Sequence, residues 1–165
     1  MNNSSRSTLL WDTPYDVLSP AQRLNYFSER QHIHFFPVLD REMTEKAFID
    51  DVLDNRFNFN GETFLLTNPI NWLCNPSLDI EWHILLHKFY YAPGLGKAWL
   101  ETKDRRYLEK WIELITSWME QTPIDLIAAD VTGRRIQNWI YSWHYFVASN
   151  HTESIDPQFH ERLLD

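Results

Sequence analysis

The stretch DRRYLEKWIELITSWMEQ, residues 104–121, indicates the fold class more clearly than any other segment of this chain. Asp104 suits a helix N-cap, and Pro123 ends the helix shortly after the stretch. Between them, large apolar side chains recur at helical spacing: Leu108, Trp111, Ile112, Ile115, Trp118 and Met119. The stretch therefore predicts a long amphipathic helix with a buried apolar face.

Helical patterns also dominate the segments on either side of this stretch. They predict helices from Ser19-Pro20, over about residues 40–53, from Ser77 toward Tyr91, from about residue 130 to Val147, and over residues 159–164. The Asn/Ser-rich residues 1–12 are expected to be a flexible tail, and residues 13–165 a single helical domain.

Two of these segments carry more detailed expectations. Pro93-Gly94 and Gly96 are expected to kink or break the helix that begins at Ser77 before Ala98 and Trp99. The helix that begins near residue 130 is expected to bury one apolar face, made of Ile136, Trp139 or Ile140, Trp143 and Val147.

One segment has a different period. Residues 56–66 read RFNFNGETFLL, with apolar residues alternating on both sides of Asn60-Gly61. This dipeptide readily adopts the positive φ angles of a two-residue hairpin turn, so we predict a short β-hairpin. The alternative is a loop with two buried phenylalanines. The predicted fold class is thus mainly α, with one short β-hairpin.

Composition excludes some classes of function. A formal charge of −8 and a pI near 5.3 argue against nucleic-acid binding, and against a polyanionic substrate unless positive charge is gathered locally. The single cysteine, Cys74, rules out an internal disulfide. Residues 1–10 lack the apolar region of a signal peptide, and no apolar run is long enough for a membrane span, so we expect a cytoplasmic protein that does not contact a membrane.

Several segments, taken in their order along the chain, resemble the N-terminal domain of the heparinase II/III family. The resemblance spans about residues 57–147, and the family usually continues its helix where this chain has Pro93-Gly94. The segments are Asn71-Trp72, Asp79-Ile80-Glu81-Trp82-His83, Ala98-Trp99, Thr102-Lys103-Asp104-Arg105-Arg106-Tyr107, Trp118 and Arg134-Arg135-Ile136-Gln137-Asn138-Trp139.

This resemblance implies a partial α/α toroid, made of helical hairpins around a cavity and followed in the family by a β-sandwich. Family members cleave uronic-acid glycans by β-elimination, which needs a neutralised carboxylate, a base for the C5 proton and an acid for the leaving oxygen. The family's Asn or His, Tyr and His for these roles lie downstream of this chain. We therefore assign no catalytic residue and expect the chain to be inactive alone, with an acidic polysaccharide or oligosaccharide and the remaining toroid and β-sandwich as its partners.

The first candidate site for substrate binding is Arg134, Arg135 and Asn138. An arginine can grip a glycan carboxylate with two parallel hydrogen bonds, and amides can order sugar hydroxyls. We expect Arg135 or Arg134 to reach a concave surface shared with Asn138 and at least one tryptophan. The alternative is that the arginines pair with carboxylates of a neighbouring helix, for example Glu109 or Glu113.

Four further residues are candidates for substrate binding. Trp72 and Trp82 could stack on a sugar ring, although core packing is the alternative. His83 and His87 are separated by four residues, a spacing that suits two zinc ligands, but no third ligand is evident. We therefore interpret these histidines as the polar edge of a helix that lines the toroid interior, and predict neither a metal nor another cofactor.

Two rival functions stay open at this stage. One is a non-catalytic glycan-binding or scaffold module in polysaccharide metabolism. The other is a toroid glycosidase, which needs two inward carboxylates about 5–9.5 Å apart. Glu81 has no evident partner for that role in the sequence.

Overall fold

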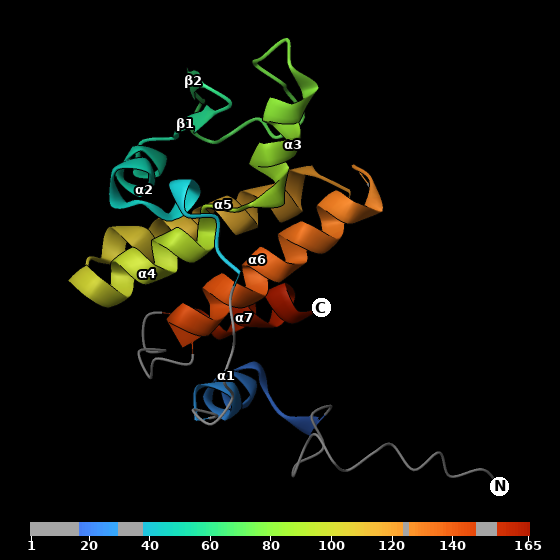
Figure 1. The fold of residues 1–165 in the computed structure, drawn as a ribbon. Helices are drawn as coiled ribbons and strands as arrows, with labels where there is room; N and C mark the ends of the chain where they lie inside the picture. The colour runs from blue at the N-terminus through green and yellow to red at the C-terminus, as the bar shows by residue number, and fades with distance from the viewer. Residues whose placement is uncertain (1–16, 30–37, 124–125, 148–154) are drawn as a thin grey trace, which may run out of the picture.

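The computed structural model describes residues 17–29, 38–123, 126–147 and 155–165. Figure 1 shows α4, α5 and α6 as long helices across the middle of the molecule, with α2, the hairpin and α3 on one side and α7 and α1 on the other. The elements of this part are α1 (Pro20–Ser28), η2 (Glu42–Thr44), α2 (Lys46–Leu53), β1 (Arg56–Phe59), β2 (Glu62–Leu65), α3 (Ile80–Lys88), α4 (Ala92–Thr102), α5 (Arg105–Gln121), α6 (Ala129–Val147) and α7 (Pro157–Leu164). The predicted fold class, mainly α with one antiparallel hairpin, is confirmed.

The predicted amphipathic helix is α5. Its N-cap is Asp104, whose side chain accepts a hydrogen bond from the backbone N–H of Arg106 at 3.0 Å. The helix ends at Gln121, two residues before Pro123. Its buried face carries Tyr107, Leu108, Lys110, Trp111, Leu114, Ile115 and Trp118, and the partly buried Ile112 and Met119 pack against the same core.

The hairpin also forms as predicted. Phe57 pairs with Phe64 across the two strands, and the turn residues Asn60 and Gly61 have φ angles of 54° and 81°. Phe57 and Phe59 are buried, because the hairpin lies against α2 and α3. The β-hairpin prediction is therefore correct, and the two phenylalanines that the loop alternative would have buried are buried within the hairpin.

Three predicted helix boundaries are wrong. The helix expected from about residue 40 begins at Lys46, after the separate short 3-10 helix η2. The helix expected from Ser77 begins at Ile80, with Asp79 as its N-cap. It ends at Lys88, where Phe89 adopts a left-handed conformation with φ of 56°. The break therefore precedes Pro93, which fits the first turn of α4, where its missing N–H is tolerated.

The two glycines after Pro93 lie inside α4 and do not break it. A Cβ atom at Gly96 would lie 2.6 Å from Cβ of Tyr145 on α6, so only glycine permits this close approach of α4 and α6. A Cβ atom at Gly94 would lie 2.5 Å from Cδ1 of Ile49 on α2, which is the end of a side chain that can move. Gly96 thus sets the distance between α4 and α6, which the sequence pattern alone did not indicate.

The predicted buried face of α6 is also wrong, by about a third of a helical turn. Ile136 and Ile140 are 45% and 44% exposed, and Trp139 and Trp143 are only partly buried. Val147 is buried as expected. The residues that point inward are Val131, Arg135, Asn138, Ser142 and Phe146, at i, i+4, i+7, i+11 and i+15.

Polar residues can occupy this inward face because the core supplies them with hydrogen-bond partners. Ser142 Oγ accepts a hydrogen bond from Trp111 Nε1 at 2.7 Å, and Asn138 Nδ2 donates to the carbonyl of Lys88 at 2.8 Å. Buried polar groups with such partners are compatible with a stable interior. These contacts join α6 to α5 and to the end of α3.

Within the described residues, no helix is long and apolar enough to cross a membrane. The longest helix, α6, carries polar side chains on its inward face as well as on its surface.

We expect Trp118→Ala to lower the free energy of unfolding by roughly 3–5 kcal/mol, the range for emptying a large buried site. Trp118 is 4% exposed, its Nε1 donates to His87 Nδ1 at 2.9 Å, and Arg135 lies over its ring. Urea unfolding of the variant measures the loss. Ile80→Ala, at a site 63% exposed, is the control and should change stability by less than about 0.5 kcal/mol. A loss below about 1 kcal/mol for Trp118→Ala would contradict this description of the core.

Candidate functional site

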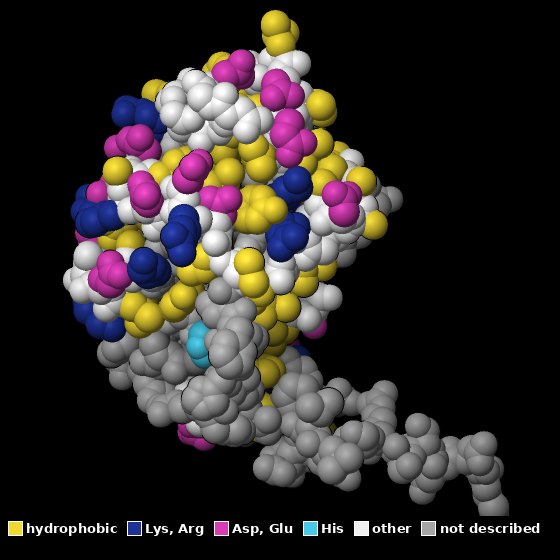
Figure 2. Space-filling view, viewed as in Figure 1, with side chains coloured by type: hydrophobic (Ala, Val, Ile, Leu, Met, Phe, Trp, Pro, Cys, Tyr) yellow, Lys and Arg dark blue, Asp and Glu magenta, His cyan; other side chains and the backbone are white. Residues whose placement is uncertain are grey.

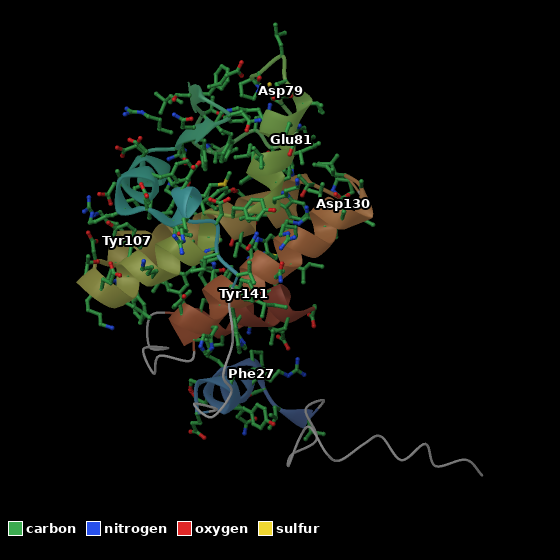
Figure 3. All side chains as sticks on the ribbon, viewed as in Figure 1. Phe27, Asp79, Glu81, Tyr107, Asp130 and Tyr141 are labelled. Carbon is green, nitrogen blue, oxygen red and sulfur yellow. The ribbon has the colours of Figure 1, made fainter. Side chains whose placement is uncertain are left out.

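One flank of α6 carries a row of polar side chains. Arg134, Gln137 and Tyr141 follow each other at i, i+3 and i+7, and all three are partly exposed. Arg134 Nη1 donates to Gln137 Oε1 at 2.6 Å, and Gln137 Nε2 donates to the Tyr141 hydroxyl at 2.8 Å. The guanidinium carbon of Arg134 lies 5.8 Å from the ring centroid of Tyr90. We call Arg134, Gln137, Tyr141 and Tyr90 the polar flank; Figure 3 labels Tyr141 on α6.

Arg134 forms no ion pair with any residue that the structure describes. The carboxylates considered as alternative partners are engaged elsewhere, because Glu109 pairs with Arg105 at 3.6 Å and Glu113 with Lys110 at 2.9 Å. That alternative is therefore wrong for these two carboxylates. On the face shown in Figure 2, acidic and basic side chains are interspersed. Arg134, which has no ion pair among the described residues, is therefore a local positive site in an acidic protein.

Arg135 lies on a different side of α6 from Arg134. It is 2% exposed, its guanidinium carbon lies 3.8 Å from the ring centroid of Trp118, and its Nη2 donates to Thr132 Oγ1 at 3.2 Å. Its Nη1 is buried without a hydrogen-bond partner. Burial lowers the pKa of Arg135 to about 10, and no carboxylate of the described residues offsets this effect. The guanidinium groups of Arg134 and Arg135 therefore do not belong to one binding site, although the sequence grouped them in one candidate site.

Asn138 lies in the core and does not form a binding site with either arginine. It is 2% exposed, and its side-chain nitrogen donates to the carbonyl of Lys88 at the end of α3. This residue holds α6 against α3, and the amide is not presented to the surface.

Trp72 and Trp82 lie fully inside the core. The Trp72 ring stacks on Phe89 with centroids 5.3 Å apart, and its Nε1 donates to Ser117 Oγ at 3.0 Å. Trp82 Nε1 donates to the carbonyl of Glu62 at 3.0 Å. Both side chains have 0% exposure, so no ring face is open to a sugar. The stacking hypothesis is wrong for these two residues, and the core-packing alternative describes them.

His83 and His87 lie side by side, but not as a metal site. Their Nε2 atoms are 3.0 Å apart, and both lie within 3.0 Å of the Trp72 carbonyl oxygen. The Trp118 indole N–H donates to His87 Nδ1, so the neutral ring of His87 carries its proton on Nε2. A protonated nitrogen has no lone pair for a metal, and the described residues hold no group of three potential ligands. His87 instead joins α3, α5 and the loop of Trp72.

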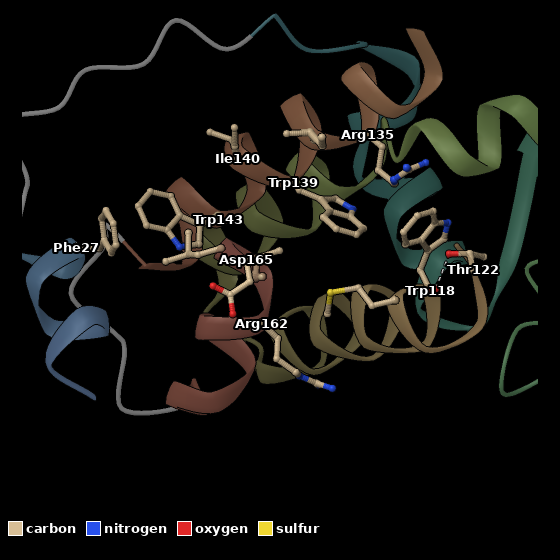
Figure 4. Close-up of a pocket in the computed structure, with 13 residues that line it drawn as sticks. Phe27, Trp118, Thr122, Arg135, Trp139, Ile140, Trp143, Arg162 and Asp165 are labelled. Atoms are coloured by element: carbon tan, nitrogen blue, oxygen red, sulfur yellow. Dashed lines mark hydrogen bonds between the residues drawn. The ribbon is translucent and has the colours of Figure 1, made fainter. Parts of the chain in front are cut away.

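The sequence reasoning missed a groove of about 500 Å³ between α5, α6 and α7, with Phe27 of α1 at one end (Figure 4). Most of its lining is apolar, and six of the lining residues are Trp118, Arg135, Ile136, Trp139, Ile140 and Trp143. Arg135 therefore does reach a concave surface together with tryptophans, but Asn138 does not line it. The missed signal was that apolar residues of α6 cover more of the helix surface than one buried face requires.

Two buried histidines make the fold sensitive to acid. Burial and the neighbouring His83 lower the pKa of His87 from 6.5 to about 3, and burial lowers the pKa of His160 to about 4. A histidine whose pKa is lower in the folded state favours unfolding once it is protonated. The stabilising contribution is complete above pH 6.5 and is lost as the pH falls toward these lowered values.

We therefore expect the free energy of unfolding to fall by roughly 1–2 kcal/mol for each of these histidines between pH 8 and pH 5. Urea unfolding at several pH values measures the loss. The His87→Gln variant should be less stable than the parent chain at pH 8, but its stability should fall less steeply with acid. Equal slopes for the two proteins would show that His87 is not responsible.

Comparison with known proteins finds relatives of this chain among the heparinases. The sequence profile described as the heparinase II/III N-terminus matches residues 18–163. A heparin-sulfate lyase of Bacteroides stercoris is 22% identical over 151 residues, which are 82% of this chain and 23% of that protein. The structure of the heparan sulfate lyase HepC of Pedobacter heparinus matches with a TM-score of 0.69 and 19% identity, over 88% of this chain and 25% of HepC.

A heparinase III structure matches equally well, with a TM-score of 0.70 and 18% identity over 88% of this chain and 27% of that protein. These likenesses show that the helices form the same fold as one part of the heparinase structures. The chain spans about a quarter of the length of the relatives that it matches.

Proposed function

This chain belongs to the heparinase II/III N-terminal family, and from that membership we propose that it forms the N-terminal toroid portion of a polysaccharide lyase. The substrate class is a uronic-acid glycan, cleaved by β-elimination. The support is that a heparin-sulfate lyase and a heparan sulfate lyase share its sequence pattern and fold over more than four-fifths of the chain.

The polar flank of α6 is the surface that we propose contacts the glycan. The observation that carries this assignment is the partly exposed Arg134, which has no carboxylate partner among the described residues and lies beside an aromatic ring. A guanidinium binds a carboxylate or a sulfate through paired hydrogen bonds. Gln137 and Tyr141 add an amide and a hydroxyl for sugar hydroxyls, and the Tyr90 ring offers an apolar face.

We propose that this chain supplies one of the three functions that β-elimination needs. Arg134 can neutralise a carboxylate, which acidifies the C5 proton. A base and an acid must also lie near the sugar, but His83 and His87 are held at the Trp72 carbonyl. We propose that those two groups come from another part of a longer lyase, and that this chain alone is inactive.

A non-catalytic glycan-binding or scaffold module is the second candidate, because it requires the polar flank but neither base nor acid. Binding of a glycan by a longer protein without turnover would favour it. The glycosidase alternative has less support, because it needs two carboxylates that face the substrate, and Glu81 already forms an ion pair with Lys88 at 3.4 Å.

The purified chain should not cleave heparan sulfate or alginate. β-Elimination leaves a conjugated double bond, so the product absorbs in the ultraviolet and the reaction can be followed directly. A steady rise in absorbance that depends on the concentration of this chain, and that survives further purification, would refute the proposed inactivity.

Arg134→Ala should lower the affinity of the chain for an acidic heparan sulfate oligosaccharide by roughly tenfold, as expected for the loss of a charged hydrogen bond. Arg134→Lys should give an intermediate affinity, because lysine keeps the charge but loses the paired geometry. Isothermal titration calorimetry measures both.

The matched control is Arg105→Ala, which removes the same charge from another exposed site, where Arg105 pairs with Glu109. This variant should bind like the parent chain. If Arg105→Ala weakens binding as much as Arg134→Ala, only the net charge matters and the polar flank is not the glycan site.

A further inference from the structure

Two hydrogen bonds join the polar flank, and both run in the same direction along α6. Arg134 Nη1 donates to Gln137 Oε1 at 2.6 Å, and Gln137 Nε2 donates to the Tyr141 hydroxyl oxygen at 2.8 Å. A guanidinium has five N–H donors and no acceptor, so only the oxygen of the Gln137 amide can face Arg134. The amide nitrogen therefore faces Tyr141, and the first hydrogen bond fixes the direction of the second.

This direction leaves the hydroxyl hydrogen of Tyr141 unused. The phenol oxygen accepts from Gln137, and its one hydrogen has no acceptor among the residues that the structure describes. The Tyr141 side chain is partly exposed, so this hydrogen is accessible to a ligand. A hydrogen bond to a charged acceptor is shorter and roughly twice as strong as one to a neutral acceptor. Tyr141 is thus placed to donate, and an anionic oxygen is the acceptor that suits it best.

Gln137 also keeps the Tyr141 hydroxyl apart from the part of Arg134 that can grip a carboxylate. Because Nη1 is held by Gln137, the edge that remains for paired hydrogen bonds is made of Nε and Nη2, which have no partner among the described residues. The amide of Gln137 lies between the guanidinium and the phenol. A carboxylate bound at that edge of Arg134 therefore leaves Tyr141 for a second group of the ligand.

We propose that the polar flank binds two acidic groups of one glycan chain, the first at Arg134 and the second at Tyr141. Gln137 is the positioning residue, because it aims the Tyr141 hydroxyl at the second group. The inference rests on the proposed function and makes its substrate class more specific. A uronic-acid glycan supplies the second group either as a further carboxylate along the chain or as a sulfate, since both present anionic oxygens.

Three tetrasaccharides of equal length test the assignment. The first has two uronate carboxylates. In the second, one of these carboxylates is replaced by an alcohol, and the third is this second compound with one N-sulfate added. The chain and its Tyr141→Phe variant are titrated with each by calorimetry. Tyr145→Phe is the matched control, because it removes a hydroxyl one turn further along α6, where the side chain lies against Gly96 of α4.

We expect Tyr141→Phe to weaken binding of the two-carboxylate compound by roughly tenfold, as for the loss of a hydrogen bond to a charged group. Binding of the one-carboxylate compound should change by less than about twofold, because Arg134 holds its carboxylate. A tenfold loss for the N-sulfated compound supports the proposal with the sulfate as the second group. Tyr145→Phe should bind all three like the parent chain.

Two results overturn the proposal. In the first, Tyr141→Phe changes the affinity for neither the two-carboxylate nor the N-sulfated compound. In the second, it weakens the one-carboxylate compound as much as the others, which would mean that Tyr141 contacts a neutral part of the sugar. Tyr141 and Gln137 are partly exposed, so their variants should unfold in urea close to the midpoint of the parent chain.

Gln137→Met tests the positioning role. Methionine is of similar length but has no amide, so the Tyr141 hydroxyl is no longer aimed. We expect a loss of roughly threefold in affinity for the two-carboxylate compound, and almost none when the change is made in the Tyr141→Phe background. Losses of equal size in the two backgrounds would show that Gln137 does not act through Tyr141.

Arg134→Ala separates this inference from the proposed function. If this variant binds all three compounds like the parent chain, the polar flank is not the glycan site and both proposals fail. If Arg134→Ala weakens binding and Tyr141→Phe does not, the polar flank binds one acidic group, and only the present inference fails.

Discussion

The fold depends on the hydrogen bond that Trp118 of α5 donates to His87 of α3. This contact fixes the neutral tautomer of His87, whose other ring nitrogen then lies against the carbonyl of Trp72. A single buried imidazole thus joins two helices and the loop between the hairpin and α3. The interior is rich in tryptophan, and each buried indole N–H needs an acceptor. Two of the polar residues in the core serve tryptophans in this way, because Ser142 accepts from Trp111 and His87 accepts from Trp118.

The helix α6 has three sides, and each of them lies in a different environment. Its inward side holds Asn138 and Ser142, which hydrogen-bond to neighbouring helices. One flank carries Arg134 on an open polar surface, and the other carries Trp139 and Trp143 at the apolar groove. Adjacent residues of a helix point about 100° apart, which is why Arg134 and Arg135 face different environments although they are neighbours in sequence.

The sequence predicted an element correctly where its apolar pattern was compatible with only one buried face or one turn. In α5 the apolar residues form one narrow stripe, and in the hairpin Asn60-Gly61 allows one turn, so both elements form as predicted. In α6 the apolar residues cover more than half of the circumference, and two different faces could be buried. The choice depended on partners such as Trp111 and the Lys88 carbonyl, which come from distant segments. The same limit applied to the candidate site. Trp72 and Trp82 were candidates because tryptophan rings can stack on sugars, but their burial in the core could be learned only from the structure.

The close approach at Gly96 has a consequence for how the two flanks of α6 can communicate. Because the backbone of α4 lies against Tyr145, α6 cannot turn about its own axis without a collision between the two helices. A ligand on one flank therefore cannot be sensed on the other through a rolling motion. A displacement of α4 and α6 together, as one unit, would instead carry both surfaces with it.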